Sequence, residues 1–564
     1  MKLSARSGLI AMWLTTGALL GAGVYATQSA AAASPMATTA VTSAPDVASR
    51  QAGVPGQASP NPTVDSAAGA AADSAALTPS GPPASGVGAG SAPIEAGAGA
   101  AQITPQSVRV TDDIDIPLHE RLVGLIGMLV LLGMAYGLSV NRAMIPWRLV
   151  LWGMGLQIVF ALLILKTPVG AAFFSWINDV IVALLGFTEE GARFLFGNLA
   201  VNNVPVGVGE PGMGGFAPTA GAVANTGAFF AFNVLPTIIF FSSLMTMLYY
   251  FGIMQAVVKG VAWVMVRTMK TSGAETLSAA GNIFLGQTEA PLLIKPYIAR
   301  MTMSELMAVM TGGFATVAGG VMAAFVGLLM AFFPDIAGHL MAASVMSAPA
   351  ALVFAKIMWP ETEEPVTRGS LQVDVEKIDA NVIDAAARGA GEGLHLALNV
   401  GAMLLAFIAM IALLNALLGW IGGVTNLTDL FQNIGWLAAG QPLNLESMLG
   451  WIFAPLAWVM GVPWADAPAV GSLLGIKTAV NEFVAYLQFS ALLGGDTELS
   501  PRSVVIATYA LCGFANFSSI AIQIGGIGGI APARRSDLAR IGLRAMIAGT
   551  LAAFMTATIA GLLV

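Results

Sequence analysis

The sequence predicts an all-α polytopic membrane protein with about eight transmembrane helices, two re-entrant hairpins, interfacial helices and an inverted repeat. Of its 564 residues, 56% are hydrophobic and 10% are charged, whereas soluble domains carry about 25% charged residues. Several apolar stretches reach about 18 residues or more, the length that a membrane span requires. Two polar runs, near residues 282–291 and 481–486, place a carboxylate inside these apolar regions.

The N-terminal part resembles an export signal followed by a tether. In residues 1–34, two basic residues precede an apolar run and then small residues, which is the order of a secretory signal peptide. An uncleaved anchor helix is the alternative, because the apolar run is slightly long. Residues 35–115 are rich in Ala, Ser, Pro and Gly, so we expect a disordered extracytoplasmic tether.

Residues 116–270 are predicted to form N-terminal spans, interfacial helices and a scaffold. Alternating polar and apolar positions over 170–200 suit helices at the membrane interface, and a Gly/Pro-rich loop is expected at 203–222. The expected spans cover 122–140, 149–165 and 229–250.

The remaining chain is predicted to contain two related halves. Residues 271–357 would form the first hairpin and two spans (303–332 and 337–357), and residues 441–564 the second hairpin region, a broken span and the last span. Residues 358–440 would connect them through a cytoplasmic loop, a span at 394–421 and an extracytoplasmic segment. One half would enter from the cytoplasmic side and the other from outside, as expected for an inverted repeat with a central site.

The distribution of basic residues predicts the orientation. With the mature N-terminus outside, the basic clusters near Arg142, Lys259, Arg388 and Arg534 all fall on the cytoplasmic side, as the positive-inside rule requires. The C-terminus would also lie outside a bacterial-type inner (plasma) membrane. The net charge of -7 gives no support to nucleic-acid binding, which needs a clustered basic face.

The first polar run places an amide, a hydroxyl and a carboxylate on Gln287, Thr288 and Glu289. A carboxylate at membrane depth costs at least a few kcal/mol, so it normally faces a wet cavity or a partner. Pro291 prevents an ordinary helix through this point, and the amide and carboxylate suit a planar, hydrogen-bonding ligand such as a base. The alternative is that Glu289 caps or pairs within a helix break.

The second polar run supplies Asn481 and Glu482, and a carboxylate suits vicinal hydroxyl groups. The alternative is that Glu482 pairs with Lys477, about one turn earlier on the same helix. A broken span nearby adds an aromatic ring, an amide and a hydroxyl, which would otherwise serve helix packing: Phe514, Asn516 and Ser519.

A cation site is predicted beside the first run. Asn282 and Thr316 offer side-chain oxygens, and unwound carbonyls at Leu285 and Val317 would complete an oxygen-lined pocket. Hard cations require such oxygen ligands, and no histidine or cysteine cluster competes for a softer metal. The alternative for Thr316 is ordinary packing against a neighbouring helix.

Four motifs resemble those of the concentrative nucleoside transporter family. They are Asn233-Val-Leu-Pro-Thr-Ile-Ile-Phe-Phe-Ser-Ser243, Gly286-Gln-Thr-Glu-Ala-Pro-Leu292, Asn481-Glu-Phe-Val-Ala-Tyr486 and Cys512-Gly-Phe-Ala-Asn-Phe-Ser-Ser-Ile520. The resemblance runs from about residue 118 to the C-terminus and does not cover residues 1–115. It implies a homotrimer in a lipid bilayer that imports nucleosides with a cation by an elevator-type cycle.

The resemblance also assigns roles to individual residues. It implies nucleobase contacts from Gln287, Thr288, Glu289 and Val321, and ribose contacts from Glu482, Asn516 and Ser519, with Phe514 lining the pocket. It implies sodium binding at Asn282, Leu285, Thr316 and Val317, where Thr316 replaces a frequent serine. Sodium is thus the expected coupling ion, with no other cofactor.

Besides a receptor or scaffold that uses the long N-terminal tract and binds without concentrating substrate, two rival functions remain open at this point. One is a proton-coupled nucleoside symporter in which Glu289 or Glu482 carries the proton. The other is an intramembrane enzyme that uses the two glutamates as an acid/base pair, although the sequence offers no nucleophile or catalytic metal.

Overall fold

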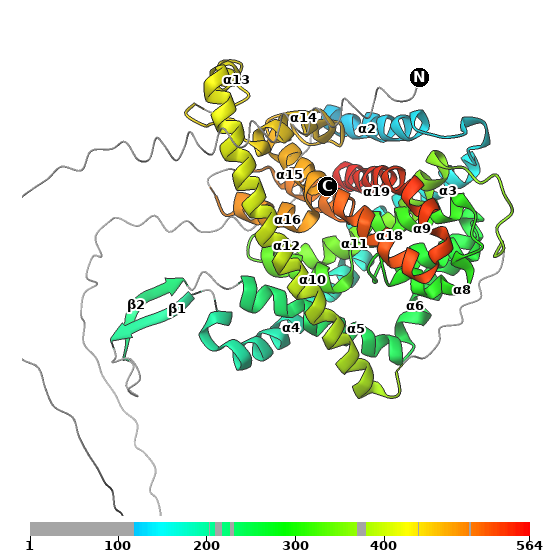
Figure 1. Cartoon of the computed structure of the whole chain (residues 1–564), viewed down its shortest axis with the longest axis horizontal. Helices are drawn as coiled ribbons and strands as arrows, with labels where there is room; N and C mark the ends of the chain where they lie inside the picture. The colour runs from blue at the N-terminus through cyan, green and yellow to red at the C-terminus, as the bar shows by residue number, and fades with distance from the viewer. Residues whose placement is uncertain are drawn as a thin grey trace, which may run out of the picture. The chain divides into compact units, whose positions relative to one another are not determined.

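The computed structural model describes residues 118–201, 203–208, 217–225, 230–368, 379–437, 439–495 and 498–564. The predicted signal segment and tether lie outside the described residues. The described chain is almost entirely helical (Figure 1), because a helix satisfies every backbone hydrogen bond within one apolar segment. Seven helical segments in this part of the chain are long and apolar enough to cross a membrane, close to the predicted number.

The first helices match the predicted spans but not every predicted detail. They are α2 (Leu118–Gly137), η1 (Arg142–Met144), α3 (Trp147–Lys166), α4 (Pro168–Phe196) and η2 (Gly197–Ala200). Thr167 caps α4 by accepting from the Gly170 N–H. The segment expected to form interfacial helices is one helix of 29 residues, so its position at the membrane interface stays a prediction.

The expected loop at 203–222 contains two strands instead. Strands β1 (Asn203–Val208) and β2 (Ala217–Asn225) pair antiparallel, with an irregularity between Pro205 and Gly207. Valine occupies every second position of β1, and a period of two in β-branched residues favours a strand over a loop.

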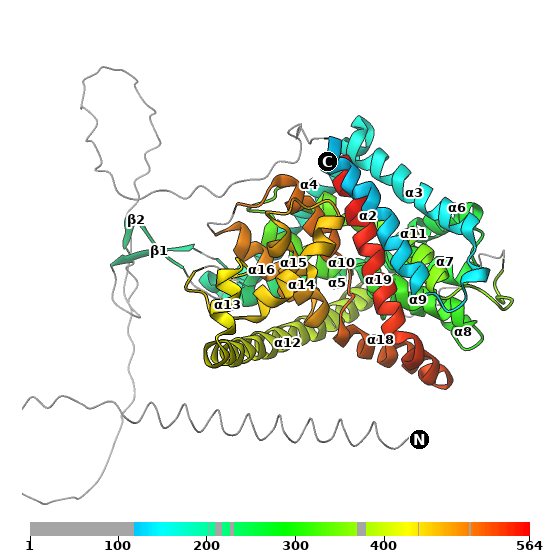
Figure 2. The same ribbon diagram turned by 90° about the horizontal axis from the view of Figure 1, so that it is seen from above.

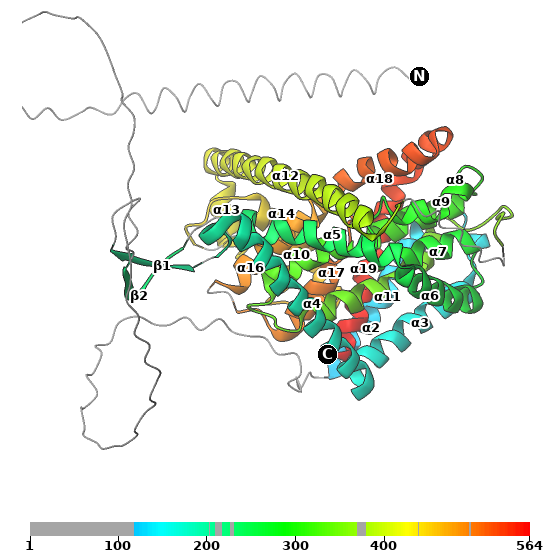
Figure 3. The same ribbon diagram turned by 90° about the horizontal axis from the view of Figure 1, so that it is seen from below.

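A long helix packs against the next span. Beyond η3 (Phe230–Val234), α5 (Leu235–Tyr250) and α6 (Ile253–Met269), helix α12 (Val382–Thr425) runs for 44 residues beside α5 (Figure 3). A Cβ at Gly393 would come within 2.7 Å of the Ile239 Cα. This glycine therefore permits the close approach of the two helices.

The two predicted halves share one order of elements. The first contains α7 (Gly273–Gly281), η4 (Ala290–Ile294), α8 (Lys295–Ile298), α9 (Met303–Ala315), α10 (Gly319–Leu329) and α11 (Ile336–Met358). After α13 (Leu427–Asn433) and α14 (Leu445–Val459), the second contains α15 (Ala467–Ala479), α16 (Glu482–Leu493), α17 (Pro501–Leu511), α18 (Phe517–Ile530), η5 (Pro532–Arg534) and α19 (Arg535–Leu563). Each half consists of a pair of short helical segments with an interruption between them, followed by a broken helix and then one long helix.

The expected span at 303–332 is found as one apolar segment, Met303–Leu329, which consists of two helices separated by a break at residues 316–318, where the sequence predicted an unwound carbonyl at Val317. Thr316 and Ala318 have extended backbone conformations. The Gly319 N–H donates to the Phe284 carbonyl oxygen at 3.0 Å, so the loop of the first hairpin satisfies a donor at the start of α10. Both halves therefore contain a broken helix, whereas the sequence predicted a broken span by name only in the second half.

Helix α11 lies at the centre of the core, whereas α12 lies at its edge. In the most apolar 18-residue stretch of each helix, 89% of the residues are buried in α11 but only 22% in α12. Helix α19 is also largely buried and runs beside α2 (Figure 2). The breaks between α9 and α10 and between α17 and α18 thus occur in the interior, where exposed backbone needs a partner.

Candidate functional site

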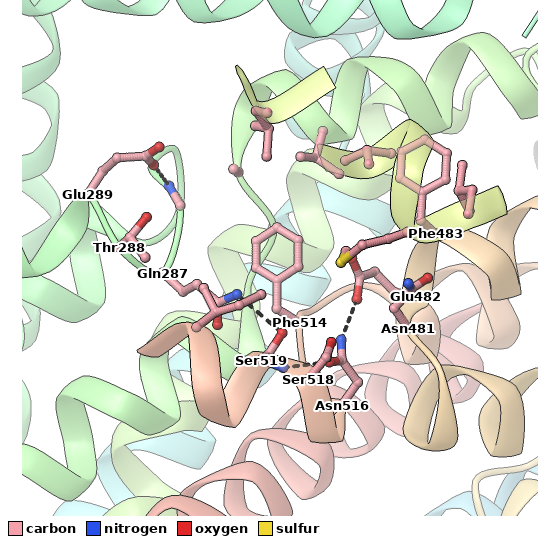
Figure 4. A pocket seen from close by; sticks show the side chains of 18 residues that line it. Gln287, Thr288, Glu289, Asn481, Glu482, Phe483, Phe514, Asn516, Ser518 and Ser519 are labelled. Atoms are coloured by element: carbon pink, nitrogen blue, oxygen red, sulfur yellow. Dashed lines mark hydrogen bonds between the residues drawn. The ribbon is translucent and has the colours of Figure 1, made fainter. Parts of the chain in front are cut away.

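One cavity gathers eight of the predicted site residues. The empty space within it is about 720 Å³, a figure that includes the solvent at its open mouth. All predicted base-contacting, ribose-contacting and pocket-lining residues border it (Figure 4): Gln287, Thr288, Glu289, Val321, Glu482, Phe514, Asn516 and Ser519. The two carboxylates that the sequence singled out, Glu289 and Glu482, therefore share one cavity.

The turn before η4 presents the first polar run. The Glu289 carboxylate accepts a hydrogen bond from the Gly286 N–H, so the local capping that the sequence left as an alternative does occur. A Cβ at Gly286 would collide with this carboxylate, which explains the glycine. Capping does not remove Glu289 from the cavity, because the residue also lines it.

Gln287 and Thr288 rest on helix α18. The Gln287 Nε2 atom donates to the Ser519 Oγ at 3.2 Å, and a Cβ at Gly526 would lie 2.7 Å from the Thr288 Cγ2. The hairpin turn of the first half is therefore held against the broken helix of the second half.

The second polar run begins helix α16. Asn481 caps this helix by accepting from the Val484 N–H at 2.9 Å, which leaves Glu482 in the first turn, where the helix dipole favours a carboxylate. The Glu482 Oε2 accepts from the Asn516 Nδ2 at 2.9 Å. In the described chain no ion pair joins Glu482 to Lys477, whose Nζ donates to the Ala510 carbonyl oxygen at 2.7 Å.

Asn516 connects the groups predicted to contact ribose. Its Oδ1 accepts from the Ser519 N–H at 2.8 Å and from the Ser518 Oγ at 2.7 Å, while its Nδ2 donates to Glu482. Asn516 is 1% exposed, so this network is fixed before any ligand arrives. Phe514 lies between Glu289 and Glu482 in the view of Figure 4.

Helix α12 forms an apolar wall that sequence analysis missed. Its contribution is four residues spaced to lie on one helical face: Leu396, Val400, Met403 and Leu404. Since α12 is apolar on nearly every face, its hydrophobic pattern does not indicate which side meets a cavity. Phe483 and Ser518 also line the cavity and were not predicted, although both adjoin residues that were.

The predicted cation-binding residues lie where two backbone breaks meet. Asn282 is fully buried, and within the described part of the chain neither its Oδ1 nor its Nδ2 has a hydrogen-bond partner. Leaving one such buried group unpaired costs about 1–3 kcal/mol, so the position needs a further ligand. The Thr316 Oγ1 donates to the Gly312 carbonyl oxygen at 2.9 Å, which leaves its lone pairs available.

The two backbone segments predicted to complete the cation site are in contact with each other. The turn that carries Leu285 lies against the break that carries Val317, because the Gly319 N–H bonds the Phe284 carbonyl oxygen. These donors are neutral oxygens, whereas protein sites for Ca²⁺ generally include carboxylates. The site chemistry therefore fits a monovalent cation.

Three family models match the chain. One described as Na+ dependent nucleoside transporter C-terminus matches residues 339–561, and its N-terminal counterpart matches residues 126–199. A third, described as Nucleoside recognition, matches residues 231–332. The matched regions contain both hairpins and both broken helices.

Individual relatives cover most of the described chain. An uncharacterized transporter of Haemophilus influenzae is 45% identical over 446 residues, which is 78% of this chain and 98% of the relative. Sodium/nucleoside cotransporter 1 of Mus musculus is 41% identical over 457 residues, which is 79% of this chain but 64% of that longer relative. The chain thus spans somewhat less than two thirds of this mammalian protein.

Solved structures of CNTnw share the fold. The inward-facing substrate-bound state is 42% identical with a TM-score of 0.66, covering 79% of this chain and 98% of that one. A variant in an outward-facing state has a TM-score of 0.67 at 42% identity, with the same coverage. Together with the relatives, these matches confirm the resemblance in the motifs: the chain belongs to the concentrative nucleoside transporter family.

Proposed function

We propose that this protein imports nucleosides by sodium symport across the inner (plasma) membrane of a bacterial-type cell. The main support is the single cavity that joins Glu289, from the first half, to Glu482, from the second. The mouse relative is a sodium/nucleoside cotransporter, and the C-terminal family model carries a sodium-dependent description. The relatives are transporters, so membership gives no support to an intramembrane enzyme.

The nucleoside would lie across the cavity with its two parts on different halves. Gln287, Thr288, Glu289 and Val321 would contact the base. Glu482, Asn516 and Ser519 would hold the ribose hydroxyls, because a carboxylate accepts two charge-assisted hydrogen bonds from a vicinal diol. Phe514 and the apolar wall of α12 would cover the faces that carry no polar group.

Sodium would bind at the buried Asn282. The Asn282 and Thr316 side-chain oxygens, with the Leu285 and Val317 carbonyls, would replace water around the ion. The two open amide atoms of Asn282 support this assignment, since the ion would give its oxygen a partner. The site lies on the same hairpin as Gln287, which provides a route for coupling ion and nucleoside.

Transport would follow an elevator-type cycle in a homotrimer. The polar lining comes from the two hairpins and the broken helices, whereas one wall is the apolar face of α12. We infer that the polar elements move together past α12, with both hairpins re-entrant and both termini outside. CNTnw has been solved in inward-facing, intermediate and outward-facing states, which is the behaviour such a cycle requires.

A proton-coupled symporter is the remaining rival. It is favoured by Glu289, whose carboxylate lines the cavity and accepts one hydrogen bond within the described chain, from the Gly286 N–H. A carboxylate that borders a cavity can exchange a proton with water there.

The two mechanisms separate when sodium is replaced by choline at constant pH. Purified protein in proteoliposomes should accumulate labelled uridine with an inward sodium gradient and lose that accumulation in choline. Accumulation that persists without sodium and follows the pH gradient would establish the rival. Intact uridine recovered from the vesicles would separate transport from chemical conversion.

A further inference from the structure

Gln523 does not line the cavity but contacts Gln287, whose amide does. The residue is fully buried on α18. Its Nε2 donates to the Gln287 Oε1 at 3.1 Å and to the Met310 carbonyl oxygen at 3.1 Å. One amide group thus joins α18, α9 and the turn of the first hairpin.

These two bonds fix the orientation of the Gln287 amide. A backbone carbonyl oxygen can only accept, so the Met310 carbonyl requires the N–H side of the Gln523 amide to face it. The other hydrogen of the same nitrogen meets the Gln287 Oε1. Gln287 must therefore direct its Nε2 the other way, toward Ser519 and the cavity.

Close packing keeps the two amides in this arrangement. A Cβ at Gly313 on α9 would lie 2.9 Å from both the Gln287 Cβ and the Gln523 Nε2. Ser519, Gln523 and Gly526 are spaced by four and three residues, so one face of α18 holds the whole turn. The glycine at position 313 therefore allows α9 to approach both amides closely.

We propose that Gln523 is a positioning residue that determines nucleobase selectivity. By holding the Gln287 oxygen, it makes the Gln287 Nε2 a fixed hydrogen-bond donor toward the base. The cavity then favours nucleosides whose base presents an acceptor at that edge. The inference rests on the proposed function and deepens it.

The first test removes the amide and keeps the side chain unbranched. In Gln523→Met, the KM for uridine should rise about tenfold, the value of roughly one hydrogen bond, with Vmax within about twofold. Gln157 on α3 is a matched control, because it is also fully buried and, in the described chain, its Nε2 bonds only atoms of its own helix, including the Met154 sulfur. Gln157→Met should leave the KM unchanged.

A double-mutant cycle distinguishes positioning from general support of the fold. If Gln523 acts through Gln287, the effect of Gln523→Met on KM should fall below about twofold in a Gln287→Ala background. An equal effect in both backgrounds would overturn the proposal.

Gln523→Glu should reverse the Gln287 amide. A buried, protonated glutamate whose hydroxyl oxygen takes the place of the Gln523 Nε2 donates its one O–H to the Met310 carbonyl, and the same oxygen then presents only lone pairs to Gln287, which turns its Nε2 toward them. Uridine and cytidine exchange donor and acceptor at N3 and at the C4 substituent. Their ratio of Vmax/KM should therefore change at least about fivefold in this variant.

The possible results distinguish a failure of this inference from a failure of the proposed function. A wild-type protein that accumulates no nucleoside would contradict both. A transporting wild type, with an unchanged uridine-to-cytidine ratio in Gln523→Glu, would overturn the inference alone. That ratio also carries the test if Gln523→Met fails to fold.

Discussion

The two halves of the molecule share a backbone design but treat their polar groups differently. In the first half, the break at 316–318 contacts the turn that follows Asn282, whose amide has no hydrogen-bond partner among the residues that the structure describes. In the second half, the break at 512–516 ends in Asn516, whose amide bonds Glu482, Ser518 and Ser519. The first half leaves atoms open for an ion, and the second completes its own network before a ligand binds.

The bases of the two hairpins also differ, in the groups that hold their carboxylates. In the first half, Lys356 lies 2.7 Å from the Glu275 Oε2, with both side chains almost fully buried, and bonds Ser304 and Glu361. In the second half, Asp466 accepts from serine groups at the start of α17, Ser500 and Ser503. The first anchor thus contains a buried lysine–glutamate ion pair, whereas at the second a carboxylate is held by serine hydrogen bonds.

Lys356→Met should produce the largest effect on stability. It leaves the buried Glu275 carboxylate without its cation, which costs about 3–5 kcal/mol. Asp466→Asn keeps an acceptor for the serines and should cost about 1 kcal/mol. Thermal unfolding in detergent measures both, and equal losses would remove the distinction between the two anchors.

Glu482→Gln should abolish measurable ribonucleoside uptake. Removing the charge that holds two hydroxyls should lower Vmax/KM at least about 100-fold, near 2.7 kcal/mol, without affecting membrane insertion. Glu446→Gln is a matched control, because Glu446 also begins a helix and accepts from an asparagine, Asn415, at 2.9 Å. Wild-type uptake in Glu482→Gln would refute the ribose role.

Asn282→Ala should act on the ion rather than on the nucleoside. We expect the half-saturating sodium concentration to rise at least about tenfold, because one of four oxygen ligands is lost. Asn178→Ala removes another buried amide with an open oxygen, on α4, and should change nothing. A sodium requirement that survives Asn282→Ala would place the ion elsewhere.

Ser518→Ala should have the smallest effect. The Ser518 hydroxyl only supports the Asn516 Oδ1, which keeps its bond from the Ser519 N–H. The KM for uridine should rise about two- to threefold, as for one partly exposed hydrogen bond. A loss as large as that of Glu482→Gln would mean that Ser518 itself contacts the ligand.

Much of the site could be predicted because its polar residues are conspicuous in an apolar sequence. A carboxylate or amide in a membrane segment is costly, so Glu289, Glu482 and Asn282 each indicated a function before any geometry was known. That Glu289 and Glu482 share a cavity also followed from the repeat.

The remaining features depend on packing that composition does not encode. Leu396 and Val400 resemble every other apolar residue of α12, and only the folded chain reveals that they face the cavity. The break at Thr316 needs the Phe284 carbonyl from another segment. Gln523 was missed because a single glutamine in an apolar helix gives no indication of its partner.

A cryo-EM structure of the reconstituted protein with uridine and sodium tests the central claim most directly. We predict the base beside Gln287 and Thr288, the ribose hydroxyls on Glu482, and an ion at Asn282. Uridine bound away from either Glu289 or Glu482, in a cavity that only one half lines, would contradict the account.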